Sequence, residues 1–481
     1  MSADLDITRK DLTAACGEIR EGNAAMGGVG ETGEVPAPDV TRPAFVALPG
    51  STEEAAAVMR VAAQHELAVV VRGGGSRFSW GTPPSRCDLV IDTSLMSGVI
   101  EHAAGDLVAR MQAGARMRDI QATLAQAGQE IALDVPGDAS VGGVVASGLA
   151  GPRRLRYGTP RDLLIGITIV RADGTIAKAG GKVVKNVAGY DLGKLFAGSA
   201  GTLGLITETT FRLHPLPTAS AFVTAEYVAV SVACDAVAAA ANSQLVASAV
   251  ELSRAEPGGP IRVGVLLEGS ADGVEARSLR MADLLGNGEV SVDAPDWWPG
   301  TPQAASGETL VRVSFWVSAL GRVLDAIAAA AAGAGVSPVI EGSAGAGVLY
   351  VRVRPGNTDD VAAAAEGTGV AAAGPTTAGS VTAGSMTWGC AEALQWAECR
   401  ATAEFVGALR RGLTEERGAV VVLTAPAAVR GELAGHDAAG HGAAGHGGMN
   451  GTVPGLALMR AVKDQFDPEH RMAPGRFPGE I

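Results

Sequence analysis

The sequence predicts an α+β protein folded into two lobes. Its 481 residues leave room for two or three domains of the usual size, about 100–200 residues each, and 47% hydrophobic residues suffice to fill their cores. Strand-like runs and amphipathic helices succeed one another up to Pro217. A second series of short strands and Ala-rich helices begins after Pro215 and Pro217, so we expect the lobes to meet there.

Charge and cysteine content exclude several classes of protein. With 38 Lys and Arg against 51 Asp and Glu, the net charge of −13 disfavours nucleic acid and anionic membranes as partners. The five cysteines are widely spaced and form no CxxC motif, so we expect neither a disulfide framework nor an iron–sulfur cluster. Because residues 1–10 are polar, we expect no signal peptide, and no apolar run reaches the roughly 18 residues of a membrane span. We expect a cytoplasmic chain that reaches the inner membrane, if at all, through a complex.

The first lobe is predicted at 42–217, after a short helix over 7–20 within an N-terminal helix and linker region over 1–41. From Phe45 a strand is followed by a helix over 55–65, with Ser51 as its N-cap, and by a buried strand over 68–71. The remaining predicted elements are strands over 89–92, 107–112, 164–171 and 175–179 and a helix over 117–127.

The second lobe is predicted at 218–434. Alternating strands and helices of this kind are typical of a ferredoxin-like sheet with helices on one face. A Gly/His low-complexity loop over 435–449 precedes a C-terminal segment over 450–481, whose helix at 455–466 we expect to pack back on the first lobe. The predicted strands of the second lobe are 221–229, 262–268, 310–317 and 348–353, and its helices are 232–244, 273–285 and 320–332.

Three glycine-rich loops form the candidate cofactor site. The loop at 72–77 directly follows the buried strand, and its three glycines allow backbone N–H groups to converge on a phosphate; a tight turn is the alternative. Further glycine-rich loops lie at 136–148 and 198–204, and three such loops suit an extended cofactor better than a mononucleotide. The fingerprint-like match at 28–33 has no strand before it and no helix after it, so we discard it.

These loops and the string Gly-Lys-Val-Val-Lys-Asn-Val-Ala-Gly-Tyr-Asp at 181–191 closely resemble the PCMH-type FAD domain of the vanillyl-alcohol-oxidase superfamily. Within it, the chain is most similar to FAD-binding subunits of bacterial glycolate oxidase. The likeness covers 42–217 well, the C-terminal tail moderately and the second lobe in outline. It implies a two-subdomain PCMH-type FAD-binding lobe plus a ferredoxin-like α+β cap, with FAD between the subdomains and its flavin facing the cap.

The resemblance also implies site residues. Covalent flavoproteins of the superfamily carry a histidine where this chain has Ser76, so we expect noncovalent FAD. The family's Asn-Pro-Gly turn near the C-terminus reads Ala473-Pro474-Gly475, which keeps the turn and loses a side-chain contact. The implied FAD contacts are Arg72, Gly73, Gly74, Gly75, Ser76, Pro136, Gly137, Val141, Gly142, Gly143, Ser147, Gly148, Gly201, Gly204 and Ile206.

The catalytic residues are not identified by the sequence. Arg153 and Arg154 are candidates to clamp a substrate carboxylate, with FAD phosphates or acidic side chains as equal alternatives. The histidine-rich catalytic and metal-binding segment of the hydroxy-acid dehydrogenase relatives has no counterpart. Three histidines in the Gly/Ala-rich tract favour a loop over a metal site, so no metal is expected, and three others are interpreted as packing residues. The tract contains His436, His441 and His446; the packing residues are His65, His102 and His214.

The function implied by the resemblance is that of an FAD-dependent oxidoreductase subunit. Its substrate would be a 2-hydroxy acid of the glycolate or lactate type, oxidised by hydride transfer to flavin. A sister FAD subunit and an iron–sulfur subunit are the expected partners, and the chain alone is expected to turn over poorly. The alternatives are a non-catalytic FAD-binding partner subunit and a stand-alone flavin-dependent dehydrogenase; a sugar or alditol oxidase is less favoured.

Overall fold

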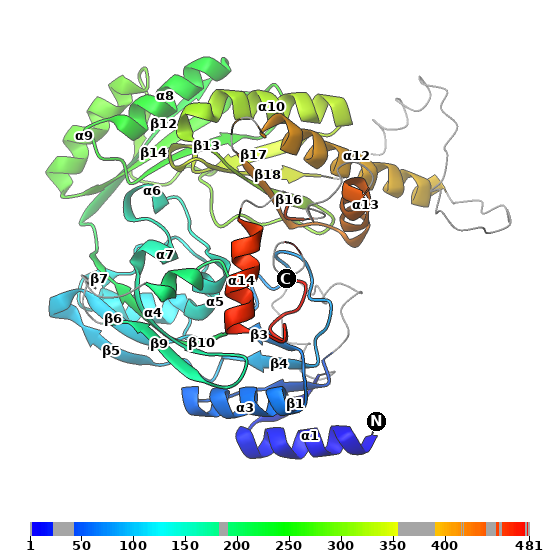
Figure 1. The fold of residues 1–481 in the computed structure, drawn as a ribbon. Helices are drawn as coiled ribbons and strands as arrows, with labels where there is room; N and C mark the ends of the chain where they lie inside the picture. Colours follow the sequence, from blue (N-terminus) through cyan, green and yellow to red (C-terminus); the bar gives the residue numbers. More distant parts are fainter. Residues whose placement is uncertain are drawn as a thin grey trace.

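The computed structural model describes residues 2–22, 43–181, 191–354, 390–414, 416, 418–438, 449–451, 455–476 and 479. They form two lobes, the first mostly blue and cyan and the second mostly green, yellow and orange in Figure 1. Helices and sheets are layered in both lobes, which confirms the predicted α+β class. The glycine motif at 28–33, most of the string at 181–191, and His441 and His446 lie outside the described residues.

The first lobe contains two subdomains, as the resemblance implies. The N-terminal one is a four-stranded sheet in the order β1-β2-β4-β3, in which β2, β4 and β3 are parallel. Helix α3 packs its buried side chains against this sheet, and α1 lies against α3 (Figure 1). The elements are α1 (Ser2–Ala15), β1 (Ile19–Glu21), β2 (Phe45–Ala47), α3 (Thr52–Gln64), β3 (Val69–Arg72) and β4 (Leu89–Asp92).

The second subdomain is a five-stranded antiparallel sheet in the order β5-β6-β10-β8-β9. Its core includes Ile120 of α4, Val144 of α5 and Phe211 of β10. A two-stranded ribbon of β7 and β11 lies beside it. The elements are β5 (Val99–Ala103), β6 (Val108–Gln112), α4 (Met117–Ala125), β7 (Gln129–Glu130), α5 (Val141–Ser147), α6 (Arg154–Tyr157), α7 (Pro160–Leu163), β8 (Leu164–Val170), β9 (Ile176–Gly180), β10 (Leu205–Arg212) and β11 (His214–Pro215).

The N-terminal helix differs from its predicted range of 7–20. Helix α1 already ends at Ala15, and Ile19 and Arg20 belong to β1, which pairs antiparallel with β2. Pairing with β2 supplies hydrogen-bond partners that the local sequence does not reveal, so the tertiary context ends the helix early. His65 holds α1 in place, because its Nε2 lies 2.8 Å from Asp11 Oδ2.

The second lobe is a single eight-stranded antiparallel sheet in the order β15-β12-β14-β13-β17-β18-β16-β19. Helices α8, α9, α10 and α12 cover one face, and the other face is turned toward the first lobe (Figure 1). The elements are β12 (Ala219–Tyr227), α8 (Val230–Asn242), β13 (Ala249–Arg254), β14 (Ile261–Gly269), α9 (Ala271–Leu284), β15 (Glu289–Ser291), β16 (Thr309–Ser314), α10 (Leu320–Ala334), β17 (Pro338–Gly342), β18 (Val348–Val353), α12 (Cys390–Gly412), β19 (Ala419–Thr424) and α13 (Ala427–Ala438).

This sheet consists of two ferredoxin-like units, β12 to β15 and β16 to β19. In each, the chain runs strand, helix, strand, strand, helix, strand, and the spatial order is fourth, first, third, second. The units join through their second strands, with Leu252 of β13 opposite Gly342 of β17. The four strands expected from the sequence are the first and third of each unit. The expected ferredoxin-like fold of the cap is therefore confirmed, and the cap contains this arrangement twice.

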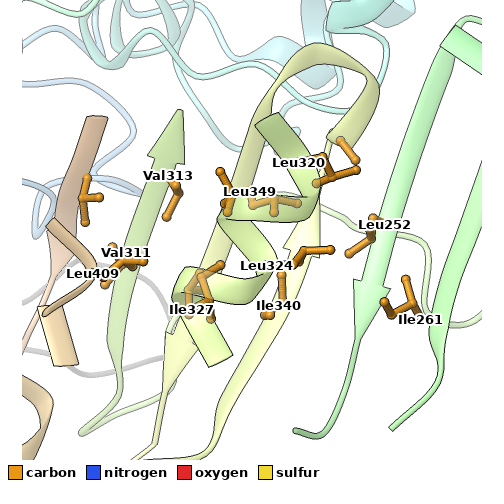
Figure 2. Packing of buried hydrophobic residues seen from close by; sticks show 14 of the residues in the cluster. Leu252, Ile261, Val311, Val313, Leu320, Leu324, Ile327, Ile340, Leu349 and Leu409 are labelled. Atoms are coloured by element: carbon orange, nitrogen blue, oxygen red, sulfur yellow. The ribbon is translucent and has the colours of Figure 1, made fainter. Parts of the chain in front are cut away.

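Alternation along the strands separates the two faces of this sheet. Figure 2 shows Leu320, Leu324 and Ile327 of α10 lying over sheet residues such as Val311 and Leu349. The segment Val317–Ala334 is the one described helix long and apolar enough to span a membrane. Its packing in this core accounts for its apolar character.

The C-terminal segment is tied into the first lobe by a buried lysine. Lys463 of α14 (Leu456–Phe466) donates from Nζ to the carbonyl oxygens of Thr202 at 2.7 Å and Met472 at 2.9 Å. Its third partner is the Asp467 carboxylate, at 2.7 Å. Met472 also forms a parallel bridge with Val69 of β3. The tail is thereby brought to the loop that follows β3.

Contacts hold the two lobes together on two sides. On one, Arg153 lies 3.3 Å from Glu268 of β14, and Arg156 of α6 donates to Ser248 Oγ at 3.1 Å. On the other, the backbone N–H of Gly81 donates to the carbonyl of Leu423 in β19 at 2.7 Å. The loop after β3 therefore reaches the second unit of the cap directly.

Candidate cofactor-binding groove and the residues around it

The glycine loop after β3 forms one wall of a groove in the first lobe. β3 ends at Arg72, and the loop then passes close to the segment that begins α5. The groove contains about 580 Å³ of empty space, part of which is open to solvent. Predicted residues that line it are Arg72, Gly73, Gly74, Gly75, Ser76, Gly143 and Ser147.

Two glycines of this loop leave no room for a side chain. A Cβ on Gly73 would lie 2.0 Å from Ser140 Oγ, and one on Gly74 would lie 2.5 Å from the Asp138 carbonyl oxygen. Gly75 has φ +78°, a conformation that residues with a Cβ rarely adopt. The loop therefore requires glycine where its backbone passes close to the segment before α5.

Ser140 joins the two glycine segments. Its Oγ accepts hydrogen bonds from the N–H of Gly74 and from the N–H of Gly143, both at 3.2 Å. The second of these bonds caps the start of α5. A Cβ on Gly142 would lie 2.7 Å from the Cβ of Ala113, so α5 also packs closely on the strand end of β6. Ser140 was not among the predicted site residues, although its position before two glycines was a visible N-cap signal.

The groove continues inward between β6, α5 and β10. This part, with about 420 Å³ of empty space, is lined mainly by small or apolar residues, among them Ala113, Ala146 and Ala200. Gly204 has φ +159°, and a Cβ there would lie 3.0 Å from the Val170 carbonyl oxygen. The predicted residues Gly142, Gly201, Gly204 and Ile206 line this inner part.

Four predicted contact residues do not line either part of the groove. Val141 is fully buried in the core of the second subdomain. Gly137 faces the side chain of Arg118, and Gly148, at φ +64°, packs against Gly198. These residues and Pro136 shape the segments that carry the groove, so the structure gives them a scaffold role.

The Arg72 side chain is engaged by an acid. Its Nη2 and Nε lie 2.6 and 2.9 Å from the same Asp92 oxygen, and both side chains are largely buried. Arg72 thus brings little free positive charge to the groove, contrary to what its place beside the glycines suggests. The register of β3 against β4 sets Arg72 opposite Asp92, and this pairing neutralises the guanidinium charge.

Arg77 and Arg476 supply the positive charge of the groove instead. Arg77 lines it, stacks 4.8 Å from the Trp80 ring, and has Nε and Nη2 buried without a hydrogen-bond partner. Burial lowers the pKa of Arg77, and burial lowers that of Arg476 to about 10. Arg476 comes from the tail and donates to the Phe78 carbonyl at 2.7 Å. The sequence places Arg77 next to the glycine loop, whereas nothing local connects Arg476 with it.

Arg153 forms ion pairs with three carboxylates. It contacts Glu130 at 2.7 Å, Asp134 at 2.7 Å and Glu268 at 3.3 Å, and these neighbours raise its pKa against the effect of burial. Of the three alternatives given by the sequence, acidic side chains are the ones that the structure brings to Arg153. This argues against Arg153 as a substrate clamp.

Arg154 has a different environment from Arg153. Its Nη2 lies 3.1 Å from the Tyr350 hydroxyl of the cap, and its other bonds are to the carbonyl oxygens of Ala150 and Gly151. No carboxylate within the described ranges forms an ion pair with it. Arg154 therefore remains available to an anion between the lobes.

His65, His102 and His214 are engaged by neighbouring side chains, whereas His470 is exposed and lies 2.8 Å from Asp464. His214 stacks edge-on with Tyr157 at 4.8 Å, and burial with nearby arginines lowers its pKa. His102 bonds Gln129 at 2.9 Å. In the part of the chain that the structure describes, no three His, Cys, Asp or Glu side chains gather in a way that would hold a metal ion. The cysteines Cys16, Cys87, Cys234 and Cys399 are free thiols.

Comparison with known sequences points to one cofactor. The family model described as FAD binding domain matches residues 43–180. The glycolate oxidase subunit GlcD of Bacillus subtilis is 33% identical over 215 residues, 44% of this chain and 45% of that protein. The subunit GlcE of Escherichia coli is 37% identical over 155 residues, 32% and 44% of the two chains. A D-lactate dehydrogenase of Archaeoglobus fulgidus is 36% identical over 187 residues, 38% and 42%. The matches span less than half the length of each of these relatives.

Solved structures share the fold over the whole chain. A substrate-bound p-cresol methylhydroxylase has a TM-score of 0.70 at 14% identity, covering 100% of this chain and 98% of that one. The 4-ethylphenol oxidase of Gulosibacter chungangensis has a TM-score of 0.67 at 13% identity, covering 99% and 97%.

The chain thus has the fold of p-cresol methylhydroxylase, with a cap over the first lobe. Residues 43–180 are an FAD-binding domain, and the groove fits its cofactor in two respects. Gly73 and Gly74 have no room for a Cβ against Ser140 and Asp138, so the loop lines the groove with backbone, and Arg77 offers a half-buried cation to a diphosphate.

Proposed function

We propose that the chain is an FAD-dependent oxidoreductase, or a subunit of one, that acts on a 2-hydroxy acid of the glycolate or lactate type. The observation that carries the proposal is the groove itself. The glycine loop, bonded to Ser140, lines the groove beside Arg77, whose Nε and Nη2 are buried without a hydrogen-bond partner. The same loop reaches the cap at Gly81. The names of the relatives, glycolate oxidase subunits and D-lactate dehydrogenases, support the substrate class.

In this proposal, bound FAD supplies the acceptor for a hydride from the substrate carbon. The chain's own residues would bind the cofactor and exclude water from the site. The backbone N–H groups of Gly73, Gly75 and Ser76 and the Arg77 guanidinium would hold the diphosphate, while the Gly74 N–H and the Arg72–Asp92 pair fix the loop. Trp80 and the cap strands exclude water from the space next to Arg77.

FAD is proposed to bind noncovalently, since Ser76 stands at the position where covalent relatives carry a histidine. The protein is precipitated with acid, the pellet is washed, and flavin is measured in both fractions. All of the flavin is expected in the supernatant. Flavin that stays with the pellet contradicts this part of the proposal.

A second candidate function is that of a non-catalytic FAD-binding partner subunit. It is favoured by one observation: the described residues that line the groove include arginines, serines and a threonine but no His, Asp or Glu to act as a general base. The turnover would then belong to a sister chain, with electrons leaving through an iron–sulfur subunit. In such a complex, we propose that the chain is cytoplasmic and reaches the inner membrane only through its partners.

Anaerobic spectroscopy separates the two candidates. The purified chain, with FAD bound, is mixed with glycolate or D-lactate, alone and after co-expression with a sister FAD subunit and an iron–sulfur subunit. We expect the flavin of the isolated chain to be bleached slowly and that of the complex to be bleached rapidly, as for a catalytic subunit. A bound flavin of this chain that neither acid bleaches, alone or in the complex, identifies the non-catalytic partner. Fast steady-state reduction of a dye by the isolated chain would identify a stand-alone dehydrogenase instead. A complex in which no flavin at all is reduced refutes the proposed substrate class.

A further inference from the structure

The face of the cap sheet that looks toward the first lobe carries an unusual group of cations. Arg312 of β16 lies directly opposite Tyr350 of β18, so their side chains are cross-strand neighbours on this face. Arg154, from the first lobe, reaches the same tyrosine hydroxyl at 3.1 Å. Two guanidinium groups from different lobes thus converge on one phenol.

Arg312 has no anion of its own. Its Nε is buried without a hydrogen-bond partner, and within the described part of the chain no hydrogen bond or ion pair is formed by its side chain. Burial, together with the neighbouring Arg154, lowers its pKa. A buried cation without a partner is costly, so a site that keeps one is suited to an anionic ligand.

Two other arginines on the same face of this sheet are paired with carboxylates. Arg352, two residues after Tyr350, lies 3.2 Å from Glu341, and Arg262 of β14 lies 3.3 Å from Glu226. The absence of a carboxylate is therefore particular to the surroundings of Arg312. Glu251, which lies near Arg154, does not compensate, because burial raises its pKa to about 8 and keeps it largely protonated at neutral pH.

The two ferredoxin-like units of the cap carry different side chains on the sheet face that looks toward the first lobe. In the first unit, Trp297 and Trp298 lie over Gly264, where a Cβ would meet their rings at 2.8 and 2.9 Å. Phe222 stacks edge-on with Trp298 at 4.9 Å, so that half is closed by aromatic packing. In the second unit, the corresponding face holds Arg312 and Tyr350.

The arginine pair is also connected with the cofactor groove. Trp80 packs with Tyr350, Leu310 and Leu423 in one apolar cluster, and Arg77 stacks on Trp80 while it lines the groove. Arg77 lies close enough to Tyr350 for the phenol to influence its pKa. A small acid held at Arg312 would thus lie at the end of the groove that is nearest the cap.

We propose that Arg312, together with Arg154 and the Tyr350 hydroxyl, binds the carboxylate of the substrate and selects small monocarboxylic hydroxy acids over neutral alcohols. The assignment rests on the proposed function and deepens it by naming residues of both lobes. Because Arg154 and Arg312 belong to different lobes, a carboxylate between them also joins the cap to the cofactor domain.

The test uses the full chain with FAD bound and oxalate as the probe, since oxalate has carboxylates but no C–H bond to oxidise. Its dissociation constant is read from the perturbation of the flavin spectrum and from thermal shift, in wild type, Arg312→Met, Arg312→Lys and Tyr350→Phe. Loss of a hydrogen bond to a charged group predicts weakening of roughly 10- to 100-fold in Arg312→Met. Arg312→Lys should recover part of the affinity, and Tyr350→Phe, which keeps the ring volume, should weaken binding less than Arg312→Met.

Arg262→Met is the matched control, because it removes an arginine from the same face of the same sheet and is expected to bind oxalate as wild type does. Ethylene glycol, a neutral probe, should produce no perturbation in any variant. Equal affinity for oxalate in wild type, Arg312→Met and Tyr350→Phe would overturn the assignment. If Arg312→Met does not fold, Arg312→Lys and Tyr350→Phe decide, and unchanged affinity in both overturns it as well.

The two proposals fail in different ways. Oxalate binding that depends on Arg312, without flavin reduction by any hydroxy acid in the complex, keeps the anion site and rejects the proposed reaction. Flavin reduction by glycolate or D-lactate that is unaffected in Arg312→Met keeps the reaction and rejects this site.

Discussion

Gly74→Ala tests whether close backbone approach at the glycine loop holds the cofactor. The added Cβ would lie 2.5 Å from the Asp138 carbonyl oxygen and 3.2 Å from the Ser140 N, both backbone atoms that cannot rotate away. The loop must then move off the segment before α5, and the bond from the Gly74 N–H to Ser140 Oγ is lost. Overpacking of this kind costs about 1–3 kcal/mol, which corresponds to a 5- to 150-fold weaker affinity for FAD if the strain falls on the bound state.

The assay is the flavin-to-protein ratio after gel filtration, followed by titration of the apoprotein with FAD by fluorescence. Gly105→Ala is the control, because a Cβ there meets no atom within 4 Å. Gly74→Ala should remain folded by circular dichroism, since the change removes no core volume. A dissociation constant for FAD within twofold of both wild type and Gly105→Ala refutes the reasoning and makes the loop a turn only.

Three further predictions concern buried charges. Lys463→Met should lower the free energy of unfolding by about 3–5 kcal/mol, measured by urea denaturation, because Asp467 is left buried without its cation. Arg153→Met should destabilise by a similar amount, since three carboxylates lose their partner, and should leave the oxalate affinity unchanged. Glu251→Gln should change the pH dependence of stability, because the pKa of Glu251, about 8 in the folded chain, exceeds the unfolded value of about 4.3. Wild type therefore loses up to about 1.4 kcal/mol of unfolding free energy per pH unit as the pH rises between these values. The variant lacks this loss, so its stability relative to wild type should increase from pH 5 to 8.

Each of these predictions has an exposed counterpart as control. Lys194→Met, Arg161→Met and Glu226→Gln remove the same charges from the surface, where a single ion pair contributes little. Effects as large as those at the buried positions would indicate a general charge effect. A flat difference between Glu251→Gln and wild type from pH 5 to 8 would mean that Glu251 is ionised in the folded chain.

The sequence alone was enough for the glycine loops and the fold class. Gly73 and Gly74 are where backbone must approach backbone, and glycine is the residue type that permits this without a Cβ, so the sequence pattern itself carries the physical requirement. Alternation of apolar residues likewise predicted β12, β14, β16 and β18, because these long strands each have one face in the core. The same signal is weak in the shorter strands between them, such as β15 and β17, and these were missed.

The charges around the site were decided only by the tertiary structure. Arg72 and Arg153 appear in the sequence as free cations beside a cofactor loop, yet strand register sets Asp92 against the first, and the second reaches Glu130 and Glu268 across long stretches of chain. Arg312 gives the opposite case, since nothing in the sequence distinguishes it from the paired Arg352 on the neighbouring strand. Whether a charged side chain is neutralised depends on which groups lie within a few ångströms of it, and that distance is set by the packing of segments far apart in the sequence.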